Sequence, residues 1–327
     1  MQLPPTLRHA IEQELASSNP ARLRAASATL SDSYRRDPAP SKANPPLSNN
    51  EQRAAYLAVR LPATYAAVVA VLNWTRDTAP DELHSVLDLG SGPGTALWAA
   101  TQVFPGLQSA TAFERDPRLI EIARRLAAQA EHPMLRDTTW LQGDLNATLP
   151  AGSWDLVICS YALNELPDQQ RAELVRQAWA RTAKLLVIIE PGTKPGFANI
   201  LAARARLLAQ GATLAAPCPN ALACPMAAGG DWCHFAARVE RTAEHRRLKD
   251  ATLGHEDEKF SYIAFSRDFL SNPVQRPSAR IVRHPKIFSG YTQLTLCREG
   301  EIVNTTITRS KKADWRRLKR LGWGSGW

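Results

Sequence analysis

Between residues 85 and 210, short apolar runs alternate with amphipathic stretches, and this pattern constrains the fold more than any other feature of the chain. Five short runs indicate buried strands: SVLDLG, SATAFE, TTWLQ, WDLVICS and KLLVIIE. Two longer stretches between them indicate helices: PRLIEIARRLAAQA and QQRAELVRQAWART. Alternation of this kind predicts an α/β fold with a parallel, doubly wound sheet.

The flanking segments have different patterns. Residues 1–80 predict a helical region, because apolar residues recur at spacings of three and four, with a Pro/Asn-rich linker near residues 37–50. We expect a Rossmann-like core at 81–215 and a Cys-rich metal-binding insertion at 216–259. Residues 260–327 predict a further core strand (FSYIAFSR), a small antiparallel β unit with REGE as a turn, and a basic tail.

Composition limits the class of protein. The chain has 327 residues, of which 44% are hydrophobic and 22% charged, as in ordinary globular proteins. It has no uninterrupted apolar stretch of the ~20 residues that a membrane span needs, so we expect no membrane partner. The start lacks a hydrophobic signal core, and Glu12 and Glu14 argue against a transit peptide. We therefore expect a cytoplasmic location in a bacterium, and a mitochondrial one only if the chain is eukaryotic. The oligomeric state cannot be read from the sequence.

The positive charge is localised. Residues 231–327 hold 19 basic and 11 acidic residues, a net charge of +8, out of +9 for the whole chain. A localised basic region indicates a polyanionic partner such as nucleic acid, and the alternative is a solvated basic surface. Trp315, Trp323 and Trp327 are interleaved with this charge and either stack on unpaired bases or pack on the domain. The basic residues concerned are Arg241, Arg246, Arg247, Lys249, Lys311, Lys312, Arg316, Arg317, Lys319 and Arg320.

A glycine-rich loop follows the first predicted strand, with the sequence GSGPGT at 90–95. Glycines let the backbone turn sharply and approach a ligand, and the next helix points its N-terminal amides at that ligand. The second strand ends in Glu114, whose carboxylate can accept hydrogen bonds from ribose hydroxyls. The third strand is followed by Asp144, which can accept from an adenine amino group. The alternatives are a surface carboxylate at Glu114 and a turn cap at Asp144.

The loop, in the sequence DLGSGPGT at 88–95, resembles the first motif of class I S-adenosylmethionine-dependent methyltransferases. The run DLVICS at 155–160 is similar to the fourth strand of that superfamily. The rival class, the nicotinamide dehydrogenases, carries G-x-G-x-x-G, whereas this chain has G-x-G-x-G. The resemblance implies S-adenosylmethionine as cofactor. The residues expected to bind it are Asp88, Gly90, Ser91, Gly92, Gly94, Glu114, Asp144 and Ser160.

The sequence identifies no catalytic residue. Many amino-group methylases of nucleic acids carry Asn/Asp-Pro-Pro-aromatic after the fourth strand, whereas this chain reads SYALNEL at 160–166. Cys159 lies inside a predicted buried strand, which favours packing over a nucleophilic role. Asn164 and Glu165 can line the site, although Glu165 can equally cap the next helix.

Three cysteines cluster after the fifth predicted strand. Cys218, Cys224 and Cys233 are separated by five and then eight residues. In a cytosolic chain such clusters indicate metal ligands more often than disulfides. Zinc sites usually contain closer pairs, so the spacing favours a [4Fe–4S] cluster, with zinc as the weaker alternative. Cys297 is the expected fourth ligand and His234 its alternative, while packed thiols without a metal are the third interpretation.

Five motifs over residues 50–327 resemble the methyltransferase-like small-ribosomal-subunit protein family. The resemblance implies a role in assembly of the small ribosomal subunit, with small-subunit ribosomal RNA as partner. It also implies an iron–sulfur cluster on the four cysteines. Two functions follow: an RNA methyltransferase with a structural cluster, or a non-catalytic RNA-binding assembly factor on the same scaffold. The motifs are PCP at 217–219, CPM at 224–226, DWCHF at 231–235, HRR at 245–247 and EDEKFSY at 256–262.

Overall fold

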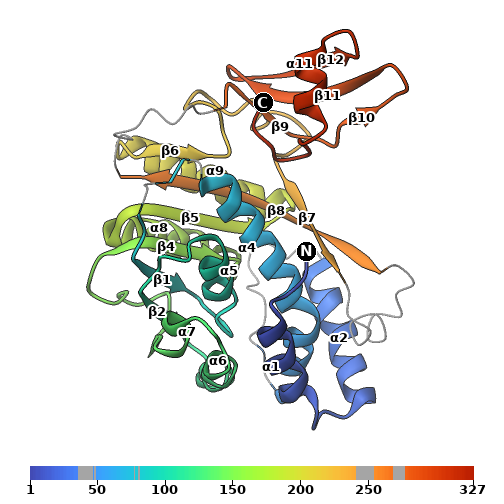
Figure 1. Ribbon diagram of the computed structural model, residues 1–327. Helices are drawn as coiled ribbons and strands as arrows, with labels where there is room; N and C mark the ends of the chain where they lie inside the picture. The colour runs from blue at the N-terminus through green and yellow to red at the C-terminus, as the bar shows by residue number, and fades with distance from the viewer. Residues whose placement is uncertain (36–46, 48, 77, 80–81, 241–253, 268–276) are drawn as a thin grey trace.

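The computed structural model describes residues 1–35, 47, 49–76, 78–79, 82–240, 254–267 and 277–327. Figure 1 shows a central sheet between helices, an N-terminal helical group beside it and a small C-terminal β unit at the top. Most of the expected linker lies outside the described residues, as do the basic side chains Arg241, Arg246, Arg247 and Lys249.

The central sheet has the strand order β3-β2-β1-β4-β5-β8-β6, and β7 pairs with β8. The first five strands of this order are parallel, whereas β8 runs antiparallel to β5, β6 and β7. The doubly wound α/β prediction is therefore confirmed, with a mixed sheet. The strands are β1 (Ser85–Leu89), β2 (Ser109–Glu114), β3 (Thr139–Gln142), β4 (Trp154–Ser160), β5 (Thr182–Pro191), β6 (Thr213–Ala216), β7 (Phe235–Glu240) and β8 (His255–Ser266).

Helices cover both faces of this sheet, which explains why its central strands are almost wholly apolar. Along β4, Leu156 and Ile158 pack in the core that contains α4 (Leu61–Arg76) and α5. Val157 and Cys159 pack on the other face, in the core that contains α8 and α9. The remaining elements of this region are α5 (Thr95–Val103), α6 (Pro117–Ala128), α7 (Pro133–Arg136), η2 (Leu163–Glu165), α8 (Asp168–Arg181) and α9 (Lys194–Ala209).

The N-terminal helices share the core of the sheet. Helix α4 buries most of its residues and contacts α5, β7 and β8. Of the described helices, the run Asn50–Arg76 alone is long and apolar enough to cross a membrane, and 83% of its most apolar stretch is buried. Core packing accounts for its composition. The helices are α1 (Pro5–Leu15), α2 (Pro20–Arg35), α3 (Asn50–Ala55), the π-helical turn η1 (Tyr56–Arg60) and α4 (Leu61–Arg76).

Strand β8 is longer than the sequence indicates. The prediction placed a strand at 260–267, but β8 begins at His255, and its first half pairs with β7 in a ribbon that extends from the sheet. The sequence does not indicate that β8 begins at His255, because residues 256–259 are charged. Glu258 faces Arg60 at 2.9 Å and Asp257 faces Arg238 at 2.8 Å, so ion pairs take the place of apolar partners.

The C-terminal unit is a small antiparallel sheet, as expected, and its REGE turn has positive φ at Glu299 and Gly300. Trp315 and Trp327 pack against its core, and Trp323 contacts His234 edge-on with ring centroids 5.0 Å apart. These indoles are therefore partly buried in packing contacts, which is the second of the two roles expected for them. The elements are β9 (Ala279–Ile281), β10 (Lys286–Ile287), β11 (Tyr291–Arg298), β12 (Glu301–Thr308) and α11 (Lys312–Leu318).

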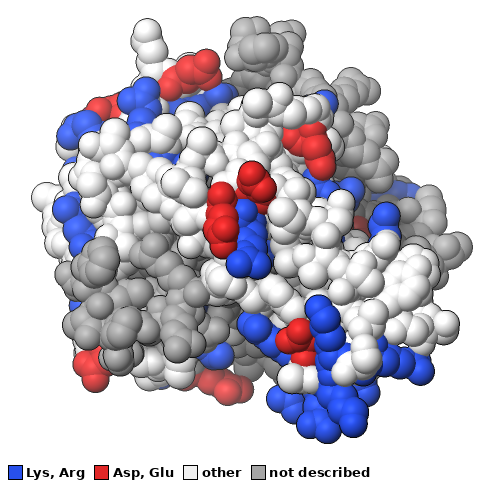
Figure 2. Space-filling model, turned by 90° about the horizontal axis from the view of Figure 1, so that it is seen from above, with Lys and Arg blue, Asp and Glu red and all other residues white. Residues whose placement is uncertain are grey.

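Basic side chains gather on this unit. Figure 2 views the molecule from the C-terminal end and shows Lys and Arg side chains crowded at one edge. The exposed basic residues of the unit include Lys286, Arg309, Lys311, Lys312, Arg316, Arg317, Lys319 and Arg320.

Candidate functional site

A cleft lies at the point where the strand order reverses. The chain passes from β1 to β2 and β3 on one side, and then to β4 and β5 on the other. The loops after β1 and β4 therefore diverge, which opens the usual ligand crevice of such sheets. The cleft measures about 1000 Å³ with its open mouth included. It is lined by five of the eight expected cofactor residues: Gly90, Gly92, Glu114, Asp144 and Ser160.

The glycine loop has the conformation that only glycine adopts without strain. Gly90, Gly92 and Gly94 have φ of +70°, +53° and +80°. A Cβ atom at Gly94 would lie 2.8 Å from the Trp140 ring, whereas one at Gly92 would meet nothing within 4 Å. Gly94 is therefore required by packing on β3, and Gly92 leaves room at the cleft.

Glu114 and Asp144 both organise nearby backbone. The Glu114 carboxylate accepts hydrogen bonds from the amides of Gly92 and Asp116, both at 2.8 Å. Asp144 accepts from the Asn146 amide at 2.8 Å, which is the turn cap considered as its alternative role. Both side chains also line the cleft, so their hydrogen bonds to backbone amides leave them able to contact a ligand there.

Buried polar atoms without a partner among the described residues occur at the end of β1 and in the glycine loop. Asp88 is 1% exposed, and neither carboxylate oxygen has a hydrogen-bond partner among the described residues. Burial, together with the Glu114 carboxylate, raises the pKa of Asp88 to about 8. The hydroxyls of Ser91 and Thr95 are also buried without a partner in the described chain. Buried polar groups are normally satisfied, so this set marks a place for a ligand or water.

Tyr161 follows β4 and was not singled out from the sequence. Its backbone is left-handed, with φ of +58°, which is costly for a side chain of this size. Its hydroxyl donates to Glu258 at 3.2 Å, and Glu258 accepts both guanidinium nitrogens of Arg60 at 2.9 and 3.1 Å. This network fixes the tyrosine at the cleft. Arg60 and Glu258 are 198 positions apart, so no local pattern could have joined them.

Glu165 also lines the cleft, beside Arg115 at 3.4 Å. Burial raises the pKa of Glu165 to about 7, although Arg115 opposes the shift. Glu190 supports the segment after β4 that contains Glu165. Its carboxylate accepts hydrogen bonds from the Leu163 amide at 3.1 Å and from the Asn199 side chain at 2.9 Å. Cys159 is 1% exposed, and burial holds its pKa well above the usual value, which agrees with a packing role.

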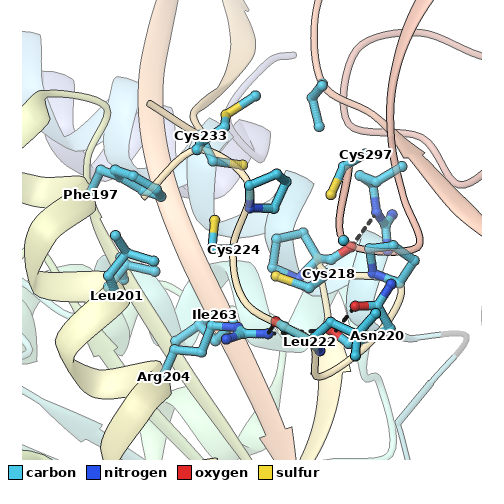
Figure 3. Close-up of a pocket in the computed structure, with 18 of the residues that line it drawn as sticks. Phe197, Leu201, Arg204, Cys218, Asn220, Leu222, Cys224, Cys233, Ile263 and Cys297 are labelled. Carbon is cyan, nitrogen blue, oxygen red and sulfur yellow. Dashed lines mark hydrogen bonds between the residues drawn. The ribbon is translucent and has the colours of Figure 1, made fainter. Parts of the chain in front are cut away.

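The four cysteines expected to bind a metal line one pocket. Figure 3 shows Cys218, Cys224, Cys233 and Cys297 around a common space, brought there from the insertion and from β11. Burial raises the pKa of Cys297 to about 12, and the neighbouring thiols add to the shift. Among the described residues, however, no group of three or more His, Cys, Asp or Glu is arranged to hold a metal ion. The structure therefore shows the four thiols in one pocket but does not confirm a metal site.

Three cationic or polar side chains tie the cysteine segment to the rest of the protein. Arg204 on α9 donates to the Leu222 carbonyl at 2.7 Å. Arg280 on β9 donates to the carbonyls of Pro217 and Gly324 at 2.7 and 2.9 Å. Ser261 on β8 donates to the Cys233 carbonyl at 2.8 Å.

His234, the alternative fourth ligand, stacks on Trp232 with ring centroids 5.0 Å apart. It is not among the residues that line the cysteine pocket, whereas Cys297 is. Of the two sequence-based alternatives, the geometry favours Cys297.

The sheet order, the glycine loop and the acidic strand ends define the class of the protein as a methyltransferase-like α/β protein. Residues 50–327 match the family described as mitochondrial small ribosomal subunit Rsm22, and the chain belongs to this family.

Two curated relatives illustrate the family. The human ribosome assembly protein METTL17, mitochondrial, is 28% identical over 185 residues, which cover 52% of this chain and 40% of that protein. Rsm22-cox11 tandem protein 2, mitochondrial, of Schizosaccharomyces pombe is 26% identical over 328 aligned residues, covering 84% of this chain and 42% of that protein. The chain thus spans about two fifths of the length of these relatives.

Solved structures to which the chain is similar include a putative RNA methyltransferase from Pyrococcus horikoshii, with 14% identity, a TM-score of 0.39 and coverage of 63% of this chain and 83% of that one. Magnesium protoporphyrin IX methyltransferase from Synechocystis, with bound S-adenosylmethionine, has 15% identity, a TM-score of 0.41 and coverage of 74% and 93%.

Proposed function

We propose that the protein binds S-adenosylmethionine in the cleft at the ends of β1 to β4 and acts on small-subunit ribosomal RNA during ribosome assembly. The observation that carries this proposal is the convergence of three strand ends on one cleft. Gly90 and Gly92 follow β1, Glu114 ends β2 and Asp144 follows β3. Residues at three neighbouring strand ends can together bind the ribose, adenine and methionine parts of one nucleoside ligand.

The residues beneath the loop fit the same ligand. S-adenosylmethionine carries a sulfonium and an ammonium group, and a buried carboxylate such as Asp88 is stabilised by positive charge nearby. Glu114 would hold the ribose hydroxyls and Asp144 the adenine amino group. When bound, the cofactor supplies the methyl group, and the protein contributes by orienting the acceptor at the end of β4, near Ser160.

The second candidate function is a non-catalytic assembly factor on the same scaffold, and the Tyr161 network favours it. The tyrosine hydroxyl at the end of β4 is held by Glu258, which is itself paired with Arg60. A phenol held in this way is a positioning group rather than a free base. The buried, bonded state of the tyrosine also raises its pKa well above the usual value, so it remains protonated at neutral pH.

Mapping of methylated nucleotides on small-subunit RNA separates the two functions. We compare cells that lack the protein, cells with Gly92→Arg and cells with Gly106→Arg. The last is a matched control, because Gly106 is exposed with open space around it. A mark lost in the first two strains supports the methyltransferase. Unchanged marks with incomplete subunits support the assembly factor. Normal marks and normal subunits without the protein contradict both.

The cysteine pocket is proposed to hold a [4Fe–4S] cluster with a structural role, with zinc as the alternative. Its support is the meeting of four thiols from segments about 60 positions apart within one mostly apolar pocket. Arg204 and Arg280 also line the pocket and fit the negative charge that thiolate-bound clusters carry. Such a cluster would join the insertion to β11 and link ligand binding to folding.

The partner is proposed to be the assembling small subunit. The basic C-terminal unit supports this, because Lys and Arg neutralise RNA phosphates. The curated relatives are named as mitochondrial, so a mitochondrial location is proposed if the chain is eukaryotic and a cytoplasmic one if it is bacterial.

A further inference from the structure

The C-terminal sheet has one covered face, and its other face is open near the turn between β10 and β11, while Cys297 at the far end of that face lines the cysteine pocket. Leu294, Leu296 and Ile307 point into the core that also contains Leu318 of α11. The alternate residues point the other way, and directly opposite residues of paired strands share a face. Gln293 lies opposite both Lys286 on β10 and Thr306 on β12. All three are exposed, which makes this open face polar and rich in hydrogen-bonding groups.

An aromatic pair stands at the end of the open face. Phe288 and Tyr291 stack at the turn between β10 and β11, with ring centroids 4.6 Å apart and planes inclined by 16°. The two residues are 43% and 37% exposed, and the adjacent Ile287 is 79% exposed. The Phe288 amide donates to the Tyr291 carbonyl at 2.9 Å, which fixes the turn that carries both rings. Contiguous exposed apolar side chains, more than single ones, mark interaction sites.

The charge around the pair has one sign. Lys286, Arg309, Lys311 and Lys312 are exposed, and the Arg309 amide donates to the Gly290 carbonyl at 3.2 Å, beside the aromatic turn. Residues 277–297 and 302–313 contain no Asp or Glu. Positive charge beside uncovered rings fits a polyanion that carries planar bases, and it disfavours a basic peptide.

We propose that this open face binds a single-stranded segment of RNA, with Phe288 and Tyr291 as the stacking platform. The inference rests on the RNA partner of the proposed function and adds the site of contact. The rings accept unpaired bases, Lys286 and Arg309 contact phosphates, and Gln293 and Thr306 offer hydrogen bonds to base edges. A duplex is a poor fit, because its bases are already stacked and cannot reach the rings.

Binding of a labelled oligouridylate to the full-length chain tests the site, measured across a range of salt concentrations. The variant Phe288→Ser/Tyr291→Ser should bind about 5- to 150-fold more weakly, the usual loss for one stacked base. Its salt dependence should not change, because no phosphate contact is removed. Lys286→Gln should instead lower the salt slope by about one. Both changes are at exposed side chains, so the melting temperature should stay near that of the wild type.

Two controls isolate stacking. Phe288→Trp/Tyr291→Phe keeps two rings and should retain binding, and Ile287→Ser removes a neighbouring apolar side chain and should cost little. This inference alone is overturned if the double serine variant binds RNA with wild-type affinity. It is also overturned if Ile287→Ser weakens binding by the same factor, or if the double serine variant loses as much affinity for an RNA duplex. If the double serine variant binds RNA normally but no longer binds a protein of the small subunit, the open face binds protein instead. A wild-type chain that binds no RNA overturns the proposed function as well.

Discussion

At the scale of single residues, the cleft combines groups that motifs reveal with groups that only the fold reveals. Gly90, Gly92, Glu114 and Asp144 could be expected from the sequence, because each follows or ends a predicted strand and parallel strand ends share one edge. Tyr161 could not, because its positive φ has no sequence signature in a residue other than glycine. The lack of partners for Asp88 is likewise a property of packing alone.

Asp88 should make the unliganded protein less stable as the pH rises. Its pKa is about 8 in the folded chain, against 3.8 for an ordinary aspartate, so between these values the folded state keeps a proton that the unfolded state has released. Stability then falls by up to about 1.4 kcal/mol per pH unit from this group. Asp88→Asn removes the titration, and its melting temperature should fall less than that of the wild type between pH 5 and pH 8. Parallel melting curves for the two proteins would contradict the assignment.

At the scale of elements, the sequence predicted β1 to β5 to within two residues, because most of them are short apolar runs that alternate with helical stretches. It missed β7 and the first half of β8, since these strands form a ribbon whose outer residues are charged. Their partners, Arg60 among them, come from distant elements. The meeting of Cys297 on β11 with the three thiols of the insertion was expected because a cluster needs a fourth ligand and because the family resemblance implies one at Cys297.

The Arg60–Glu258 pair joins η1 to β8, and both side chains are only 14% exposed. Glu258→Gln removes the carboxylate that pairs with the mostly buried Arg60 guanidinium and should lower the free energy of unfolding by about 1–3 kcal/mol. The double change Arg60→Met/Glu258→Leu removes both charges and should cost less than the single one, because apolar side chains avoid the cost of taking charges out of water. Denaturant titration of the three proteins measures the difference. A double variant less stable than Glu258→Gln would show that the attraction within the pair, rather than the burial of charge, sets the cost.

The proposed cluster is tested by its colour and iron content. Anaerobically purified wild-type protein should be brown, and Cys224→Ser should be nearly colourless and melt at a lower temperature, because one of four ligands is lost. Cys159→Ala is the matched control, since this thiol is buried in β4 away from the pocket and should leave the iron content unchanged. Full iron content in Cys224→Ser would refute the ligand set, and stoichiometric zinc in the wild type would favour the alternative metal.

At the scale of the whole molecule, the N-terminal helices and the sheet form one core, although their sequence patterns differ. Helix α1 is joined to α6 by the Glu14–Arg125 ion pair at 2.6 Å, and Leu30, Leu47 and Tyr56 line the cleft from the N-terminal side. The C-terminal unit has its own core and carries the basic surface. The cofactor cleft and the proposed RNA face thus belong to different parts of the chain, so each can be altered without loss of the other.

Calorimetric titration of S-adenosylmethionine into the full-length protein tests the central claim most directly. The account predicts one binding site, and Glu114→Ala should weaken binding by about 1–3 kcal/mol, the cost of leaving ligand hydroxyls unpaired. Glu121→Ala, which removes an exposed carboxylate on α6, should bind as the wild type does. Absence of binding to the wild type, or equal affinity of the wild type and Glu114→Ala, would contradict the account.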